Sequence, residues 1–337
     1  MKFSSLLFCF FVTTHTTLFC FKTLDQAVSY AQSLNEQVEP DNKSVINPTF
    51  NTFYQHHYPR DIKKYLFHFL EKINLKKRPL WSNEDLSSAL TQALERKTAT
   101  TTQEPHAVTL KIVPASRLYV FGDIHGAFHS LVRDLVYLKG HSIITNELVL
   151  AQPHYYLIFN GNALDQSPFS SETVTLILNL MDKNPSQVFY IKGKHEDKNY
   201  WKDQSFGQEL RIKSPNTPLE AFTNFFKTLP SAVFIKGADN AVLQISSFNR
   251  TYAPAETKKE IPFATHPQTV RVNQKENEPT PHIPLNALIT GVDRSITYQE
   301  TQGLQFLSGE KGISAWSVFS SPIVIHRTSI TSLMTHL

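Results

Sequence analysis

Apolar and polar positions follow two different rhythms along the 337-residue chain. In the first third, apolar residues recur every three or four positions, which predicts helices over about 23–38 and 61–75 and a third helix after Ser82. Ser82 is a typical N-cap residue, and Asp85 stands three positions later, where an acidic side chain favours a helix start. The polar stretch 98–106 is expected to be a linker. The first third is therefore predicted to be a small helical extension.

From Thr109 onward, short β-rich runs alternate with helical ones. We expect strands at 118–121, 155–159 and 187–192, helices at 128–138 and 173–181, and a polar stretch after residue 192. A helix at 219–229 and the strands AVFIKG and AVLQIS follow, and four strand-like runs (NALITGV, LQFLSG, AWSVFSS and VIHRTSI) fill the tail. The polar, proline-containing residues 250–284 are expected to form a long surface loop. This alternation predicts an α/β fold built on a sheet.

Composition limits the classes of function. Apolar residues make up 41% of the chain and charged residues 18%, which is enough for a packed core. The net charge of +4 is scattered, without a dense Lys/Arg tract, so no nucleic-acid partner is expected.

The N-terminus reads Met1, Lys2 and then an apolar run to Val12, which resembles a secretory signal peptide. The run is shorter than the roughly 20 residues that span a bilayer, and no later segment is long and apolar enough to do so. We expect export to a periplasmic or extracellular location, with 1–21 as signal peptide or anchor. Both cysteines lie inside this segment, so disulfides and thiolate chemistry are not expected in a processed chain. The expected parts are 1–21, a helical extension over 22–108, and a main domain over 109–337.

Three consecutive predicted strands end in polar residues. Gly122-Asp123-Ile124-His125-Gly126 follows the first, and a carboxylate and an imidazole two residues apart can hold one divalent ion. Residues 160–167 follow the second strand, and residues 193–196 follow the third. Any one of these segments is explained by turn chemistry alone. Together they predict a site, because open α/β sheets bind ligands beyond the carboxyl ends of their strands.

The order and spacing of these segments resemble the GDxHG, GDxxDRG and GNHE motifs of calcineurin-like metallophosphoesterases, in the Ser/Thr phosphoprotein-phosphatase branch. Residues 226–235 resemble the "LPLAA" segment of that branch, and residues 318–322 resemble its "FSAP" strand, so the resemblance covers about 117–325. It implies a β-sandwich flanked by helices. It also implies phosphoester hydrolysis by a hydroxide held between two metal ions, with a histidine, oriented by an aspartate, as the acid.

The resemblance assigns roles to five polar residues at the strand ends. Asp123 and His125 match the ligands of the first metal. Asn162 stands where a bridging aspartate is expected, and a neutral amide holds two dications less well than a carboxylate. His195 and Asp165 match the catalytic acid and the aspartate that orients it.

The other positions of the family pattern are altered. Lys194 stands where the second metal has an asparagine ligand; it is read either as a phosphate-binding ammonium or as a solvent-facing lysine. Gln166 replaces a phosphate-binding arginine. The two remaining histidine ligands align on 246–248 and near Val292, where this chain has none. We expect one divalent ion of the manganese, iron or zinc kind, and loss of the second metal site.

Three functions remain open at this point. The first is a degenerate phosphatase, a pseudoenzyme that binds a phosphorylated ligand or protein partner with little or no turnover. The second is an active single-metal hydrolase of phosphomonoesters. The third is a non-catalytic scaffold that acts through its helical extension.

Overall fold

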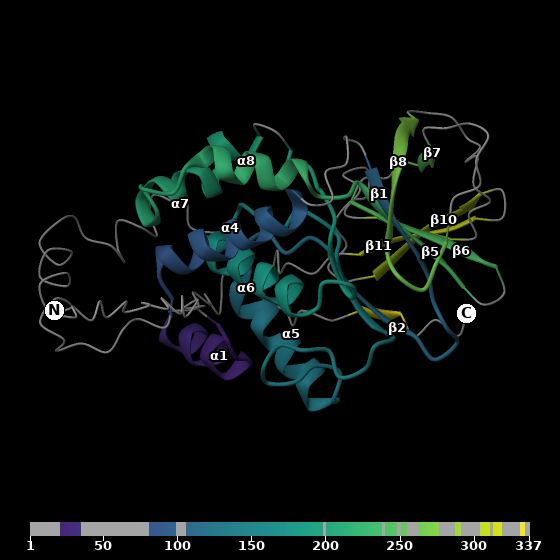
Figure 1. The fold of residues 1–337 in the computed structure, drawn as a ribbon, viewed down its shortest axis with the longest axis horizontal. Coiled ribbons are helices and arrows are strands. Elements are labelled where there is room, and N and C mark those ends of the chain that lie inside the picture. The colour runs from purple at the N-terminus through teal and green to yellow at the C-terminus, as the bar shows by residue number, and fades with distance from the viewer. Residues whose placement is uncertain are drawn as a thin grey trace, which may run out of the picture.

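The computed structural model describes residues 21–34, 81–98, 106–197, 200–237, 240–247, 251–254, 263–275, 287–290, 304–310, 313–318 and 331–333. The apolar segment before Phe21, the helix expected at 61–75 and the strand expected at 324–330 lie outside these residues. Helices gather on one side of the described part and sheets on the other (Figure 1). The chain is thus a mixed α/β protein, as the sequence predicts.

Most of the expected helices are present. These are α1 (Leu24–Ser33), α4 (Asn83–Thr98), α5 (Phe128–Gly140), α6 (Ser170–Lys183) and α8 (Leu219–Lys227), and the structure adds α7 (Ser205–Lys213) and a 3₁₀ turn, η1 (Tyr200–Asp203). The Asp85 carboxylate accepts hydrogen bonds from the Ser82 backbone N–H and hydroxyl, as expected at the start of α4. Helix α7 and η1 replace the expected polar stretch. Their apolar face is too small to stand out in the sequence, because Trp201 of η1 and Phe206 and Leu210 of α7 supply most of it.

The strands form two sheets. The smaller has the order β12-β2-β3-β4, with β2 (Arg117–Phe121), β3 (Tyr155–Phe159) and β4 (Val188–Tyr190) parallel and β12 (Thr331–Leu333) antiparallel. The larger has the order β10-β11-β9-β6-β5-β1-β8-β7. Its members are β1 (His106–Lys111), β5 (Ala232–Lys236), β6 (Val242–Ser246), β7 (Thr251–Pro254), β8 (Gln268–Lys275), β9 (Ala287–Thr290), β10 (Leu304–Glu310) and β11 (Ile313–Val318).

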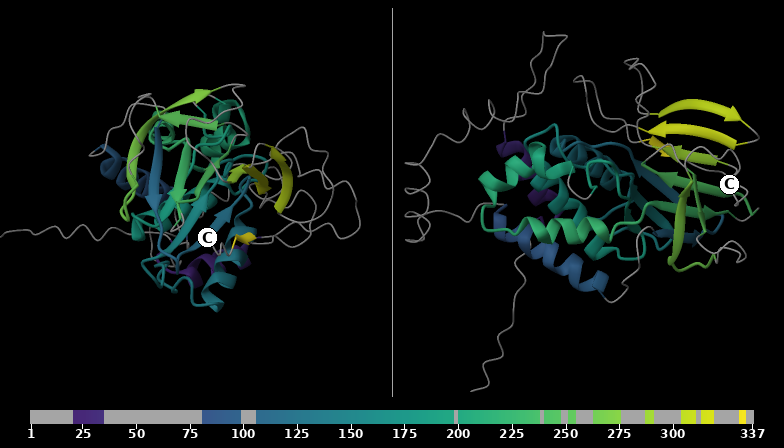
Figure 2. Two further views of the ribbon diagram at one scale, coloured as in Figure 1. Left: turned by 90° about the vertical axis from the view of Figure 1, so that its right-hand side faces the viewer. Right: turned by 90° about the horizontal axis from the view of Figure 1, so that it is seen from above.

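Alternation along the strands produces two packed layers. In β2, Leu118 and Val120 point to a core shared with β1, β5 and β6, whereas Tyr119 and Phe121 join the core under the helices. β3 and β4 alternate in the same way, so the smaller sheet is covered by the larger sheet on one face and by helices on the other (Figure 2). Burial of these side chains contributes about 1.5–3 kcal/mol each to folding. This is a two-sheet sandwich with a helical layer.

Two boundaries differ from the expectation. The surface loop expected at 250–284 is wrong in part, because β7 and β8 lie inside it and pair antiparallel with each other. β8 also pairs with β1, from His106 opposite Arg271 to Thr109 opposite Gln268. Backbone hydrogen bonds hold this polar strand, so hydrophobic periodicity did not reveal it. β1 itself begins at His106, three residues before the change of pattern expected at Thr109.

The N-terminal helices share the main core. Leu24 and Ala27 of α1 and Leu86 and Leu90 of α4 are buried in the same cluster as α5 and α6. In the part of the chain that the structure describes, no helix has the length and apolarity needed to cross a membrane.

A buried ionic network joins these helices. The Lys213 ammonium, 5% exposed, lies 2.8 Å from Glu172 and 3.0 Å from Glu209, and Tyr30 of α1 donates to Glu172. Burial raises the pKa of Glu209 to about 7. The network therefore fastens α1, α6 and α7 to one another.

Candidate metal and phosphate site

The three motif segments meet at one edge of the smaller sheet. Parallel pairing aligns Phe121 of β2 with Phe159 of β3, and Phe159 with Tyr190 of β4, so the three strands end side by side. The segments at 122–126, 160–167 and 193–196 follow these ends directly. The adjacency expected from the sequence is therefore a property of the fold.

Asn162 lies at the centre of the site. Its Nδ2 donates to Asp123 Oδ2 over 2.9 Å, and its Oδ1 accepts from the His195 backbone N–H over 3.1 Å. The two hydrogen bonds fix the orientation of the amide, with its nitrogen toward the carboxylate and its oxygen away from it. All three residues are less than a tenth exposed. A neutral amide thus fills the space between Asp123 and the segment after β4.

His125 lies on the other side of Asp123. Its Nε2 is 3.5 Å from Asp123 Oδ2, and its Nδ1 is 3.1 Å from the Leu164 carbonyl oxygen. Burial lowers the pKa of His125, but the hydrogen bond and negative charge of Asp123 and the Leu164 carbonyl outweigh burial, so the pKa is raised. The imidazole is therefore a close electrostatic partner of the carboxylate.

The acid pair expected from the resemblance is assembled. His195 Nδ1 lies 2.7 Å from Asp165 Oδ2, which leaves Nε2 as the nitrogen that can reach a ligand. Asp165 Oδ1 accepts from the Phe206 backbone N–H over 2.8 Å and from the Ser205 hydroxyl over 3.3 Å. Helix α7 was not expected from the sequence. Its N-terminal residues fix the orientation of Asp165, which in turn fixes the orientation of His195.

Glu196 ties the segments together, a role that the sequence did not indicate. Its side chain has no exposed surface and accepts backbone hydrogen bonds from Asn162, Ala163 and Gly193 over 2.8–2.9 Å. The Tyr190 hydroxyl donates to it over 2.8 Å. Burial raises the pKa of Glu196, and the hydrogen bonds from Tyr190, Asn162 and Ala163 oppose this shift. In the sequence, only its position directly after His195 could have indicated this role of Glu196.

The backbone of the site is strained. His125, Asn162, Asp165 and Gln166 have φ between +49° and +69°, in the left-handed region that L-residues avoid. Each such residue costs about 1 kcal/mol or more, and the surrounding contacts must offset that cost. Gly161, at φ +79°, permits a close approach, because a Cβ there would lie 2.5 Å from the Gly193 nitrogen. The fold therefore keeps a site backbone that is unfavourable in conformational free energy.

Lys194 points along the surface. Its ammonium lies over the Tyr200 ring, 4.8 Å from the centroid, and the same ring meets His195 edge-on at 5.0 Å. Lys194 is exposed, whereas His195 is buried. The ammonium is thus placed beside the mouth of the site, next to the imidazole.

Asp123 and His125 are the residues of this site that could hold a divalent ion. Asp123 Oδ1 is buried and has no hydrogen-bond partner among the described residues, so a carboxylate oxygen is available beside His125. No group of three His, Cys, Asp or Glu side chains suited to a metal occurs in the described ranges. At the end of β6, Ser247 rather than Ser246 packs on the site, since a Cβ on Gly161 would lie 3.0 Å from the Ser247 Cβ.

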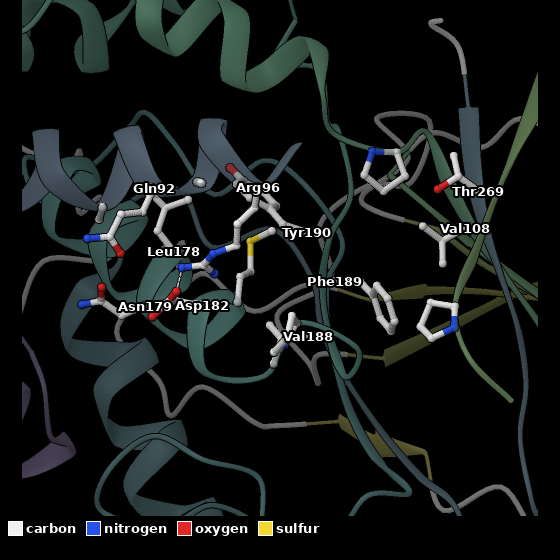
Figure 3. A pocket seen from close by; sticks show the side chains of 16 residues that line it. Gln92, Arg96, Val108, Leu178, Asn179, Asp182, Val188, Phe189, Tyr190 and Thr269 are labelled. Atoms are coloured by element: carbon white, nitrogen blue, oxygen red, sulfur yellow. Dashed lines mark ion pairs between the residues drawn. The ribbon is translucent and has the colours of Figure 1, made fainter. Parts of the chain in front are cut away.

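A separate cavity of about 290 Å³ is lined by other residues (Figure 3). Its walls come from α4, α6, β4 and β1, and the ion pair of Arg96 with Asp182 stands on its helical side. None of the polar residues described above lines it, although Tyr190 belongs to both regions. The cavity is thus distinct from the strand-end site.

A two-sheet sandwich with aspartate, histidine and asparagine beyond three parallel strands defines the metallophosphoesterase class of α/β proteins. The family profile described as calcineurin-like phosphoesterase matches residues 116–298, which is more than half of the chain. The chain therefore belongs to the calcineurin-like phosphoesterase family, and the expected resemblance is confirmed.

The curated relatives that match include serine/threonine-protein phosphatases. Serine/threonine-protein phosphatase 5 of Arabidopsis thaliana is 29% identical over 133 residues, 40% of this chain and 23% of that protein. Serine/threonine-protein phosphatase T of Aspergillus oryzae is 29% identical over 39% of this chain and 26% of that protein. The matched region thus spans about a quarter of the length of these relatives.

A solved structure also matches: a serine/threonine phosphatase of Saccharomyces cerevisiae, described as similar to human phosphatase PP5. The TM-score is 0.48 at 17% identity, and the match covers 72% of this chain and 78% of that chain.

Proposed function

We propose that this chain is a phosphate-binding member of the calcineurin-like phosphoesterase family that has little or no turnover. The observation that carries the proposal is the amide of Asn162, hydrogen-bonded on one side to Asp123 and on the other to the His195 backbone. This side chain occupies the position of the family's bridging aspartate. The Asn162 N–H donates a hydrogen bond to Asp123 Oδ2, so this carboxylate oxygen has a partner without two bound metal ions.

The electrostatics support weak catalysis. A bound divalent ion neutralises phosphate oxygens and acidifies a water molecule, and the family is expected to use two such ions and an arginine. Here Gln166 is neutral, and the Lys194 ammonium lies over Tyr200 at the mouth. A single ammonium is a point charge without Lewis acidity. The positive charge of one metal ion and the Lys194 ammonium is therefore enough to attract a phosphate group. It is too small to stabilise the transition state of phosphoester hydrolysis well.

The remaining residues suit a phosphate monoester as ligand. With Nδ1 engaged by Asp165, His195 Nε2 can donate to a phosphate or ester oxygen. Lys194 stands next to it and can approach a second oxygen. Asp123 and His125 supply the corner for one divalent ion. We propose a phosphorylated small molecule or a phosphorylated protein segment as the ligand.

The His195–Asp165 pair favours a second candidate function, a slow single-metal phosphoesterase. An oriented imidazole 2.7 Å from a buried carboxylate is the arrangement needed for protonating a leaving oxygen. In this case, metal-dependent turnover on a phosphomonoester would disappear in Asp123→Asn.

The test combines phosphate binding with turnover. Calorimetric titration of inorganic phosphate, with Mn²⁺ present, should show binding that weakens about 3–10-fold in Lys194→Met, the effect of removing one exposed charge contact. Lys202→Met is the matched control, because Lys202 also lies over an aromatic ring, Trp201, on the same stretch. Absence of phosphate binding by the wild type would overturn the proposal.

Turnover of p-nitrophenyl phosphate separates the two candidates. We expect very low wild-type activity. Restoring Asn162→Asp together with Lys194→Asn should increase metal uptake but recover little turnover, because the histidine ligands remain absent. High wild-type activity that is lost in Asp123→Asn would instead establish the single-metal enzyme.

A further inference from the structure

The layer of residues just above the inter-sheet core changes character at the site. Side chains from β2, β3, β4 and β6 meet in that core, and their last apolar members are Val120, Ile158, Ile191 and Ile245. The residues two positions later are Gly122, Asn160, Gly193 and Ser247. Side chains two positions apart in an extended chain lie on the same side of it. Two glycines and two polar residues therefore cap an otherwise apolar core, directly beneath the site.

The two polar residues of this layer are buried without partners. Asn160 has no exposed surface, and neither its Oδ1 nor its Nδ2 makes a hydrogen bond with any described residue. Ser247 is 5% exposed, and its Oγ is equally unbonded within the described ranges. Each unsatisfied buried polar group costs about 1–3 kcal/mol. Such a cost points to a ligand that these atoms hold.

Close contacts bring the segments that carry these residues together near Asp123. The Asn160 backbone N–H donates to the Phe121 carbonyl, two residues before Asp123. Ser247 packs on Gly161, the neighbour of Asn160. Asp123 Oδ1 is the third unbonded oxygen in this region, because the amide of Asn162 engages only Oδ2. The three unbonded oxygens thus belong to residues 160–162 or to residues that contact them.

We propose that Asp123 Oδ1, Asn160 Oδ1 and Ser247 Oγ supply oxygen ligands to the divalent ion of the site. This rests on the one-ion site of the proposed function. It adds Asn160, to which the family resemblance assigns no role, and Ser247, which lies in the segment where the family has a histidine ligand. Carboxylate, amide carbonyl and hydroxyl oxygens suit Mn²⁺ and Mg²⁺, whereas imidazole suits Zn²⁺. Three oxygens and one His125 nitrogen form a donor set that Mn²⁺ accepts. The Lys194 ammonium, held over Tyr200, does not compete for it.

Single substitutions test the two new ligands. Ser247→Ala removes the hydroxyl, and Ser246→Ala is the matched control because Ser246 lies one residue away and bonds Gln244 instead. Asn160→Leu replaces the amide with an apolar side chain of similar size. Mn²⁺ affinity is measured by calorimetry on the full chain, and the thermal midpoint is measured with Mn²⁺ and with a chelator.

We expect Ser247→Ala and Asn160→Leu each to weaken Mn²⁺ binding at least about 10-fold, while Ser246→Ala leaves it unchanged. Without metal, Asn160→Leu should fold and have a midpoint equal to or above that of the wild type, because it removes an unsatisfied amide. Unchanged Mn²⁺ affinity in both variants would overturn the inference. Phosphate binding is measured separately, so its absence refutes the proposed function without bearing on these ligands.

Discussion

Asn162→Asp is the sharpest perturbation of this site, because it changes one atom of a side chain held on both sides. The aspartate keeps the oxygen that accepts from the His195 backbone, so that contact survives. The Nδ2 that donates to Asp123 over 2.9 Å becomes a second carboxylate oxygen. A favourable contact is thus converted into repulsion between two buried anions, without a change of volume.

The magnitude follows from the geometry. Two unit charges about 4 Å apart repel by about 4 kcal/mol at an effective dielectric of 20. The lost hydrogen bond to a charged group adds about 1.5–3 kcal/mol, and a proton shared by the two carboxylates limits the total. We expect metal-free Asn162→Asp to be less stable than the wild type by about 3–5 kcal/mol, which lowers the unfolding midpoint by on the order of 5–10 °C.

Differential scanning calorimetry at pH 8, with chelator and with Mn²⁺, measures this effect. Mn²⁺ should raise the midpoint of Asn162→Asp more than that of the wild type, because a cation between the carboxylates relieves their repulsion. Asn162→Ala is the control, since it loses both hydrogen bonds but adds no charge. It should be destabilised without gaining the larger Mn²⁺ response.

The reasoning is refuted if metal-free Asn162→Asp melts at the wild-type temperature and responds to Mn²⁺ no more than the wild type. That result would mean that the Asn162 amide does not stand between Asp123 and a potential cation. A larger Mn²⁺ response in Asn162→Ala than in Asn162→Asp would have the same meaning.

Three further predictions concern the whole chain. Burial raises the pKa of the Asp134 carboxyl to about 7. The stability that its protonated form contributes is therefore full below about pH 3.8 and is lost as the pH rises through 7. In calorimetry, Asp134→Asn should raise the unfolding midpoint at pH 8 and leave it unchanged near pH 4. Lys213→Met leaves two buried carboxylates without their cation and should lower the free energy of unfolding, measured with denaturant, by about 3–5 kcal/mol. Lys139→Met, which removes an exposed ion pair with Asp25, should lower it by under about 1 kcal/mol. Residues 1–40 fused to a reporter that is active only outside the cytoplasm should give a signal, and a silent reporter would contradict the export hypothesis.

The sequence alone determined the order of the main elements and the three segments of the site. The strands 118–121 and 155–159 were predicted to the residue or within one, because a buried strand between two layers is a continuous apolar run. The motif segments could be placed at one sheet edge because parallel strands end together. Asp123, His125, Asn162, Asp165 and His195 followed from that rule and from the family spacing.

The tertiary structure decided what these residues contact. Helix α7 and strand β8 are held by packing and backbone pairing with distant segments, so their local patterns are weak. The roles of Glu196, Ser247 and Asn160 were invisible for the same reason, since each depends on a neighbour some 30 or more residues away, or on the lack of one. A sequence records donors and acceptors along the chain, whereas only the folded backbone determines which of them meet and which stay buried without a partner.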